Sequence, residues 1–208
     1  MKTSFTIQLT LLVSFILISN ISIAQKNSPL ELGSIIPMSE ELMINVTDEK
    51  MSLNNNFNEN GLLVVFSCNT CPFVVMWEDR YRQLEKMCQI NNIGMVYINS
   101  NEAKRDDEDS AESMKNYAQS MGYTFPYLID QNSAVANAFG AKTTPHTFLF
   151  NKNKKLVYKG AIDDNFRDIT KVNETYLLDA IEQMVAGLDI KLKETNAKGC
   201  SIKREIKK

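Results

Sequence analysis

The sequence is poor in the residues from which most protein metal centres are built, with one histidine and four cysteines among 208 residues. A zinc centre made from imidazole and thiolate ligands needs four of them in a suitable spacing, so few arrangements are open to this chain. The chain also lacks a strong charge of either sign, because its formal net charge is -2. That balance gives no electrostatic reason to expect a nucleic-acid partner.

The composition does supply enough apolar material for one folded unit. Hydrophobic residues make up 44% of the chain and charged residues 23%. A chain of this length can bury the core of one soluble domain but is short for two. We expect a linker at residues 25–34, one domain at residues 35–190, and a basic tail at residues 191–208. A tail of this kind is typically solvated, although it could also favour acidic surfaces.

The first 24 residues have the pattern of a secretory signal peptide. A lysine at the second position precedes the apolar run Leu9–Ile18, and Ser22-Ile23-Ala24 supplies the small residues that precede cleavage. The mature protein then begins at Gln25 and is periplasmic or extracellular, where disulfides can persist. An uncleaved membrane anchor is the alternative, because no charge interrupts the segment after its second residue.

The middle of the chain alternates between strand and helix patterns. A short hairpin is expected from Leu42–Val46 and Met51–Leu53, followed by a buried strand at Leu62–Phe66. The next apolar residues recur at helical spacing and predict one buried helix face: Val74, Trp77, Tyr81, Leu84 and Cys88. With a further strand at Ile93–Asn99, this order predicts a parallel pair with a right-handed crossover.

The second half continues in the same way. Asp109 and Glu112 resemble a capping box that opens a helix, which Gly122 ends. Expected after it are a strand at Phe125–Ile129, a short helix at Ser133–Phe139, and a hairpin of Thr147–Phe150 with Lys155–Lys159. The last helix has its predicted core residues at Tyr176, Leu177, Ala180, Ile181, Met184 and Val185.

The main chemical signal is the run Cys68-Asn69-Thr70-Cys71-Pro72, between the buried strand and the long helix. Two cysteines at this spacing can form a tight disulfide, and a helix N-terminus stabilises a thiolate. We therefore expect Cys68 to be the nucleophile and Cys71 to resolve the mixed disulfide. A permanent structural bridge and half of a zinc site are the alternatives, although the other ligands, Cys88, His146 and Cys200, show no paired spacing.

Three segments carry a family resemblance: Cys68–Pro72, the pair Thr144-Pro145, and Lys155–Asp164. Over residues 34–188 the chain resembles the thioredoxin-like superfamily, in its exported redoxin branch close to the peroxiredoxins of AhpC/TSA type. The resemblance implies an α/β fold with a central mixed sheet flanked by helices, an N-terminal β-hairpin and a helix–strand insertion. It also implies an exported thiol–disulfide oxidoreductase that needs no cofactor or metal beyond its redox-active cysteine pair.

The resemblance also implies roles for the residues around the pair. Pro145 would be cis and face the disulfide, and Thr144 would offer backbone groups to an extended substrate chain. An ordinary trans proline at the start of an edge strand is the alternative for Pro145. Asn69, Thr70 and Pro72 would lie at the start of the active-site helix, and the identities of Asn69 and Thr70 should shift the redox potential. The partners would be disulfide- or thiol-bearing exported proteins and an unidentified electron donor or acceptor.

Departures from the family pattern leave two other functions open. Many thioredoxins have a buried acid in the strand before the pair, whereas Leu62–Phe66 is wholly apolar; Glu78, Asp163 and Asp164 are candidates by position, and none is assigned. A peroxiredoxin-like peroxidase is the first alternative, with Cys71 at the peroxide-reactive position. However, Cys68 and Val64 replace the hydroxyl residue and proline of that pocket. A non-catalytic module that grips partners through the same groove is the second, although both cysteines are retained.

Two further residues are candidates for auxiliary roles. Cys200 lies in Gly199–Lys203, a string that resembles a C-terminal segment of the same branch. It could exchange with the active pair, bridge to another chain, or be a free thiol in a mobile tail. His146 follows the expected cis-proline and could tune the thiolate, although a lone strand histidine more often packs or lies at the surface. Cys88, on the apolar helix face, is expected to be a small core residue.

Overall fold

The computed structural model describes residues 29–205, so the signal-peptide prediction lies outside the described residues. The described strands are β1 (Met43–Asn45), β2 (Lys50–Met51), β3 (Gly61–Ser67), β4 (Ile93–Asn99), β5 (Tyr127–Ile129), β6 (Thr143–Thr144), β7 (His146–Asn151), β8 (Leu156–Gly160) and β9 (Cys200–Ser201). The described α-helices are α1 (Pro72–Ile90), α2 (Ala111–Met121), α3 (Ala134–Phe139) and α4 (Tyr176–Val185). Within this range, no helix has the length and apolar character needed to cross a membrane.

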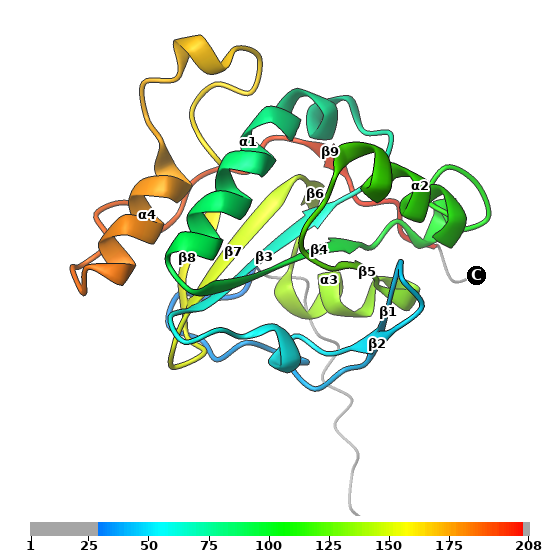
Figure 1. Ribbon diagram of the computed structural model, residues 1–208, viewed down its shortest axis with the longest axis horizontal. Coiled ribbons are helices and arrows are strands. Elements are labelled where there is room, and N and C mark those ends of the chain that lie inside the picture. Colours follow the sequence, from blue (N-terminus) through cyan, green and yellow to red (C-terminus); the bar gives the residue numbers. More distant parts are fainter. Residues whose placement is uncertain (1–28, 206–208) are drawn as a thin grey trace, which may run out of the picture.

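Seven strands form one mixed sheet in the order β2-β1-β5-β4-β3-β7-β8, and β6 and β9 form a separate antiparallel pair (Figure 1). Strands β3 and β4 are parallel and joined by α1, which confirms the predicted parallel pair and its helical connection. Every residue of both strands is buried, as is usual for parallel strands covered on both faces. The predicted hairpins β1–β2 and β7–β8 are also present.

The two faces of the sheet pack against different helices. Leu63 and Val65 of β3 point into a core cluster with α1, α2 and α4, while Leu62, Val64 and Phe66 point into a second cluster with α3. This alternation follows from the two-residue period of a strand. The residues predicted for the buried face of α1 are 0–2% exposed, so the helix pattern of the sequence is confirmed.

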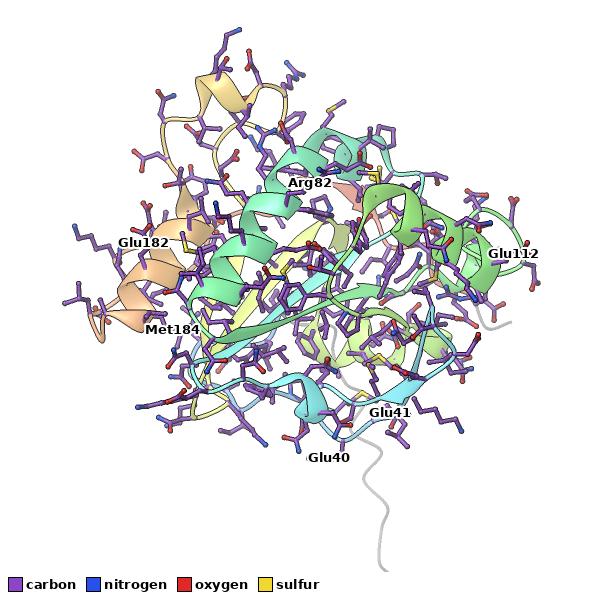
Figure 2. All side chains as sticks on the ribbon, in the orientation of Figure 1. Glu40, Glu41, Arg82, Glu112, Glu182 and Met184 are labelled. Carbon is purple, nitrogen blue, oxygen red and sulfur yellow. The ribbon has the colours of Figure 1, made fainter. Side chains whose placement is uncertain are left out.

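Two predicted details of the helices are wrong. Helix α2 is capped by Ser110, whose hydroxyl accepts a hydrogen bond from the Ser113 amide at 3.2 Å. Glu112 points outward from α2 (Figure 2), and Asp109 is fully buried, so these two residues do not form a capping box. On α4, Val185 is 39% exposed because the helix ends there and its buried residues are Leu177, Ala180 and Ile181.

Both ends of the described chain pack on the domain. The amide of Leu30 donates to the Phe139 carbonyl at 3.0 Å, and its own carbonyl accepts from the Lys159 ammonium at 2.9 Å. The amide of Thr195, in the basic tail, donates to the Lys159 carbonyl at 3.0 Å. Figure 1 shows the tail, coloured red, returning from α4 past the start of α1 to β6. The expected linker and solvated tail are therefore part of the folded unit where the structure describes them.

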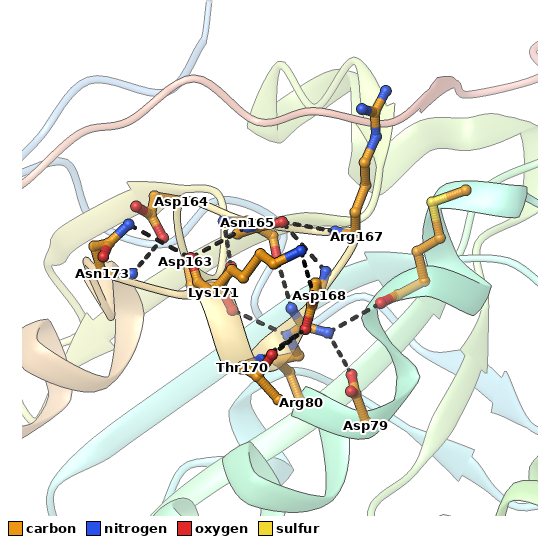
Figure 3. Close-up of polar contacts among 11 residues, drawn as sticks. Asp79, Arg80, Asp163, Asp164, Asn165, Arg167, Asp168, Thr170, Lys171 and Asn173 are labelled. Atoms are coloured by element: carbon orange, nitrogen blue, oxygen red, sulfur yellow. Dashed lines mark hydrogen bonds and ion pairs between the residues drawn. The ribbon is translucent and has the colours of Figure 1, made fainter.

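A buried ion pair connects α1 to the loop that follows β8. Arg80 Nε lies 3.1 Å from Asp163 Oδ2, and its side chain also reaches Asp79 Oδ1 at 2.6 Å and the Asn165 carbonyl (Figure 3). The guanidinium lies 5.3 Å from the centre of the Trp77 ring. Arg80 and Asp163 are both nearly inaccessible, whereas the Asp79 side chain is 52% exposed.

We expect Asp163→Asn to lower the free energy of unfolding by about 2 kcal/mol, because it removes the charged partner of a buried guanidinium. The matched change Asp79→Asn should cost less than about 1 kcal/mol, because that carboxylate is exposed and screened. Urea unfolding at a constant m-value measures both changes. Equal losses in the two variants would contradict the assignment of the stabilising pair to Asp163.

Candidate active site

Cys68 and Cys71 lie where β3 ends and α1 begins. Helix α1 starts at Pro72, with Cys71 as its N-cap residue. Both thiols are free and largely buried, with Cys68 2% and Cys71 6% exposed. Asn69 is buried between them, while Thr70 is exposed at the rim. The helix thus begins directly after the second cysteine; Pro72 is its first residue, as predicted, whereas Asn69 and Thr70 precede it.

Thr144, a residue distant in sequence from the cysteines, contacts both thiols. Its hydroxyl lies 3.2 Å from Cys68 Sγ, and its carbonyl accepts a hydrogen bond from Cys71 Sγ at 3.4 Å. The Thr144–Pro145 peptide bond is cis. The structure therefore brings together the two segments that the sequence analysis singled out, which are more than 70 residues apart.

A buried carboxylate holds the loop between the two cysteines. Asp109 Oδ1 accepts hydrogen bonds from the Asn69 amide at 3.0 Å and from Asn99 Nδ2 at 2.7 Å, and its Oδ2 accepts from Asn101 Nδ2 at 2.8 Å. The Asn69 side chain is fixed in turn by the hydroxyl of Tyr127, at 3.0 Å. Asp109 has no exposed surface, so these donors replace the water it has lost.

Asp109 was predicted to be part of a helix cap and not a residue of the site. The sequence feature that could have indicated this role is the pair Asn99 and Asn101. These amide side chains come at the end of a buried apolar strand, beside the active loop. Amides at that place need a buried partner. Asp109 also lines the cysteine cavity, whereas the residues considered by position do not. Of those, Glu78 accepts from the Tyr117 hydroxyl, Asp163 pairs with Arg80, and Asp164 accepts from the Asn173 amide.

The two thiols differ in acidity. A hydrogen bond from Cys68, together with the Val74 amide in the first turn of α1, holds the pKa of Cys71 well below its usual value. The same bond to Cys71, together with burial and the charge of Asp109, raises the pKa of Cys68. The thiolate was predicted on Cys68. The hydrogen bond between the two thiols and the Val74 amide give the lower pKa to Cys71 instead.

His146 does not reach the thiols. It lies on β7, where its ring packs 4.4 Å from the ring centre of Phe148 in the core cluster under α3. Burial lowers the pKa of His146 to about 4, so the ring is neutral at neutral pH. The suggested role in tuning the thiolate is wrong, because the strand places this side chain on the opposite face of the sheet from the cysteine pair.

The thiols open into a small cavity of about 140 Å³, whose lining includes Thr70, Lys104, Thr144, Cys200 and Lys203. One wall is the chain's own tail, because Thr144 pairs with Cys200 across strands β6 and β9. The backbone edge that an extended substrate was expected to use is therefore occupied. Across residues 29–205, no group of three or more His, Cys, Asp and Glu side chains could hold a metal ion.

Comparisons with solved structures show that the fold is shared with other proteins. Two solved structures superpose over 86% of the chain: a hypothetical protein from Sinorhizobium meliloti 1021 and an uncharacterized conserved protein from Geobacillus kaustophilus. The first has a TM-score of 0.79 and 29% identity over 98% of its length. The second has a TM-score of 0.78 and 32% identity over 94% of its length.

A curated relative adds a functional name over a short segment. The thiol-disulfide oxidoreductase ResA of Geobacillus thermodenitrificans is 41% identical over 44 residues, which are 21% of this chain and 25% of that protein. The model of the AhpC/TSA family matches residues 35–159, which include the cysteine pair and the cis-proline. The chain therefore belongs to the AhpC/TSA family, as a thiol-based oxidoreductase of the redoxin group with the thioredoxin-like fold.

Proposed function

We propose that this protein exchanges a disulfide between Cys68–Cys71 and thiols or disulfides of other proteins. The observation that carries the proposal is a pair of free thiols at the start of α1, of which Cys71 has a lowered pKa and Cys68 a raised one. Both thiols are in contact with Thr144. A low-pKa thiolate beside a protonated thiol is the arrangement that thiol–disulfide exchange requires. The curated name of the matched relative supports the same reaction.

The reaction proceeds in two exchanges. The Cys71 thiolate attacks one sulfur of a substrate disulfide, a bond forms between the two sulfurs, and the other substrate sulfur leaves as a thiolate. Cys68 then attacks Cys71 Sγ and its proton passes to the departing sulfur. The products are the Cys68–Cys71 disulfide and a reduced substrate. The reverse sequence oxidises a dithiol, so the same residues serve either direction.

The surroundings of the pair favour a narrow substrate. The cavity holds about 140 Å³ and the Thr144 backbone already pairs with β9. A single cysteine side chain on an exposed loop fits this space better than a long extended segment. Charges of both signs at the rim face the substrate residues on either side of that cysteine. They belong to Lys104, Glu108 and Lys203. We further propose export, on the strength of residues 1–24, and a separate electron donor or acceptor.

Peroxidase activity is a second candidate, because the acidic thiol is Cys71, which stands at the peroxide-reactive position. No arginine is among the described residues that line the cavity, and Cys68 takes the place of the hydroxyl residue. An oxyanion in that space would meet two lysines and two carboxylates instead. These surroundings favour exchange over peroxide reduction.

The first expected outcome concerns pH. Because its pKa is lowered, Cys71 should be a thiolate at neutral pH, and the ultraviolet thiolate absorbance of the reduced protein should rise with a midpoint well below the ordinary value of about 8.5. This rise in thiolate absorbance at low pH should disappear in Cys71→Ser and persist in Cys68→Ser. The opposite pattern would place the thiolate on Cys68.

The second outcome separates exchange from peroxide reduction. With dithiothreitol as the reductant, the protein should accelerate reduction of insulin disulfides, and Cys71→Ser should lose this activity while Cys88→Ser keeps it, because Cys88 is a core residue away from the cavity. Consumption of hydrogen peroxide should be slow in the same preparations. Rapid peroxide turnover that depends on Cys71 and survives Cys68→Ser would show the peroxidase to be the correct alternative.

A further inference from the structure

Cys200 belongs to an ordered strand beside the active pair. Strand β9 pairs antiparallel with β6, so that Cys200 lies opposite Thr144 and Ser201 opposite Thr143. Thr144 is the residue whose carbonyl accepts from Cys71 Sγ and whose hydroxyl contacts Cys68 Sγ. Three of the four cysteines therefore converge on one residue.

The tail packs against the domain on both sides of Cys200. On its C-terminal side, the Ile202 amide donates to the Lys142 carbonyl at 3.0 Å, and the Ile202 side chain is only 5% exposed in the core cluster under α3. The Lys203 amide donates to Asn101 Oδ1 at 2.9 Å, which joins the tail to the Asp109 network. On its N-terminal side, Gly199 passes so close to β6 that a Cβ atom would lie 2.1 Å from the Thr144 carbonyl oxygen.

This placement puts Cys200 at the mouth of the site. It lines the same cavity as Cys68 and Cys71, and it is more exposed than either. Hydrogen bonds from its side chain and backbone help to lower the pKa of the Cys71 thiol. Cys88, by contrast, is buried in the core and lines no part of the cavity.

We propose that Cys200 is a third exchange cysteine, which forms an intramolecular disulfide with Cys71. The inference rests on the proposed function and extends it. In the oxidised protein, Cys200 Sγ attacks Cys71 Sγ, the Cys71–Cys200 bond forms, and the Cys68–Cys71 bond breaks. Cys68 leaves with the proton that Cys200 gives up. No electrons are gained or lost, and the disulfide moves from the buried floor of the cavity to its more exposed wall.

The same position lets Cys200 act on a substrate adduct. When Cys71 is joined to a substrate sulfur, attack by Cys200 on Cys71 Sγ forms the Cys71–Cys200 disulfide and releases the substrate as a thiol, which takes the proton from Cys200. Cys71 is then the central residue of the three, with Cys68 on one side and Cys200 on the other. Either neighbour can complete the exchange that Cys71 begins.

Disulfide mapping tests the proposal directly. The reduced full-length mature protein is oxidised with glutathione disulfide, free thiols are blocked with N-ethylmaleimide in acid, and the protein is digested with trypsin. Cleavage after lysine and arginine leaves Cys68 and Cys71 on residues 51–80, Cys200 on residues 199–203, and Cys88 on residues 87–104. A linked pair of the first two peptides therefore reports a bond from Cys200 to the active loop.

The informative variant is Cys68→Ser, in which Cys71 and Cys200 are left to pair. We expect the peptides 51–80 and 199–203 to be linked in monomeric protein, and the link to be lost in Cys68→Ser/Cys200→Ser. Cys88→Ser, the matched control, should leave the wild-type disulfides unchanged. Gly199→Ala keeps all three thiols but pushes β9 from β6, and should reduce the linked fraction severalfold. If Cys71 and Cys200 of Cys68→Ser are instead blocked separately, or Cys71 carries only glutathione, the proposal is wrong.

Failure of this proposal can be told from failure of the proposed function. In Cys200→Ser, formation of the internal Cys68–Cys71 disulfide on residues 51–80 supports the proposed exchange reaction whatever Cys200 does. If that disulfide forms but no variant links residues 199–203 to it, the pair is active and Cys200 takes no part. If it forms in no variant under oxidising glutathione, the proposed function itself fails.

Discussion

The buried carboxylate of Asp109 is the interaction on which the rest of the site depends. It accepts from the Asn69 backbone between the two cysteines and from the side chains of Asn99 and Asn101 at the end of β4. Asn101 also accepts from the Lys203 amide, so one residue connects the active loop to the tail. Removing this carboxylate would leave the Asn69 amide and Asn101 Nδ2 without their acceptor and Asn99 Nδ2 with only the Tyr127 hydroxyl, which is costly for buried donors. The loop between the cysteines and the tail at Lys203 are therefore both connected to this carboxylate.

The second constraint is the contact between the two thiols at the start of α1. The hydrogen bond between the two thiols lowers the pKa of Cys71 and raises that of Cys68, and it is reinforced by the Val74 amide beside Cys71 and by the negative charge of Asp109 near Cys68. Two cysteines three residues apart thereby acquire different acidities. The order of attack proposed above, with Cys71 first, follows from this difference. The spacing of the cysteines alone would allow either order.

Local patterns in the sequence predicted most of the fold, whereas contacts between distant segments decided the site. The buried face of α1, the strands β3 and β4 and the hairpins were predictable, because each is encoded by the spacing of neighbouring apolar residues. The resemblance also placed Thr144 beside the pair. Asp109 and the docking of the tail were missed, since both depend on partners far along the chain. His146 was misplaced because one step of strand register decides which face a side chain reaches.

The claim that this site exchanges disulfides is tested most directly by equilibrating the protein with glutathione buffers of graded potential and measuring the internal disulfide on residues 51–80. It predicts a reversible two-electron transition of Cys68 and Cys71. A midpoint near about -270 mV would indicate a reductant and one near about -120 mV an oxidant. A pair that stays reduced in oxidising buffer, or a disulfide that glutathione cannot open, would contradict the claim that this site exchanges disulfides.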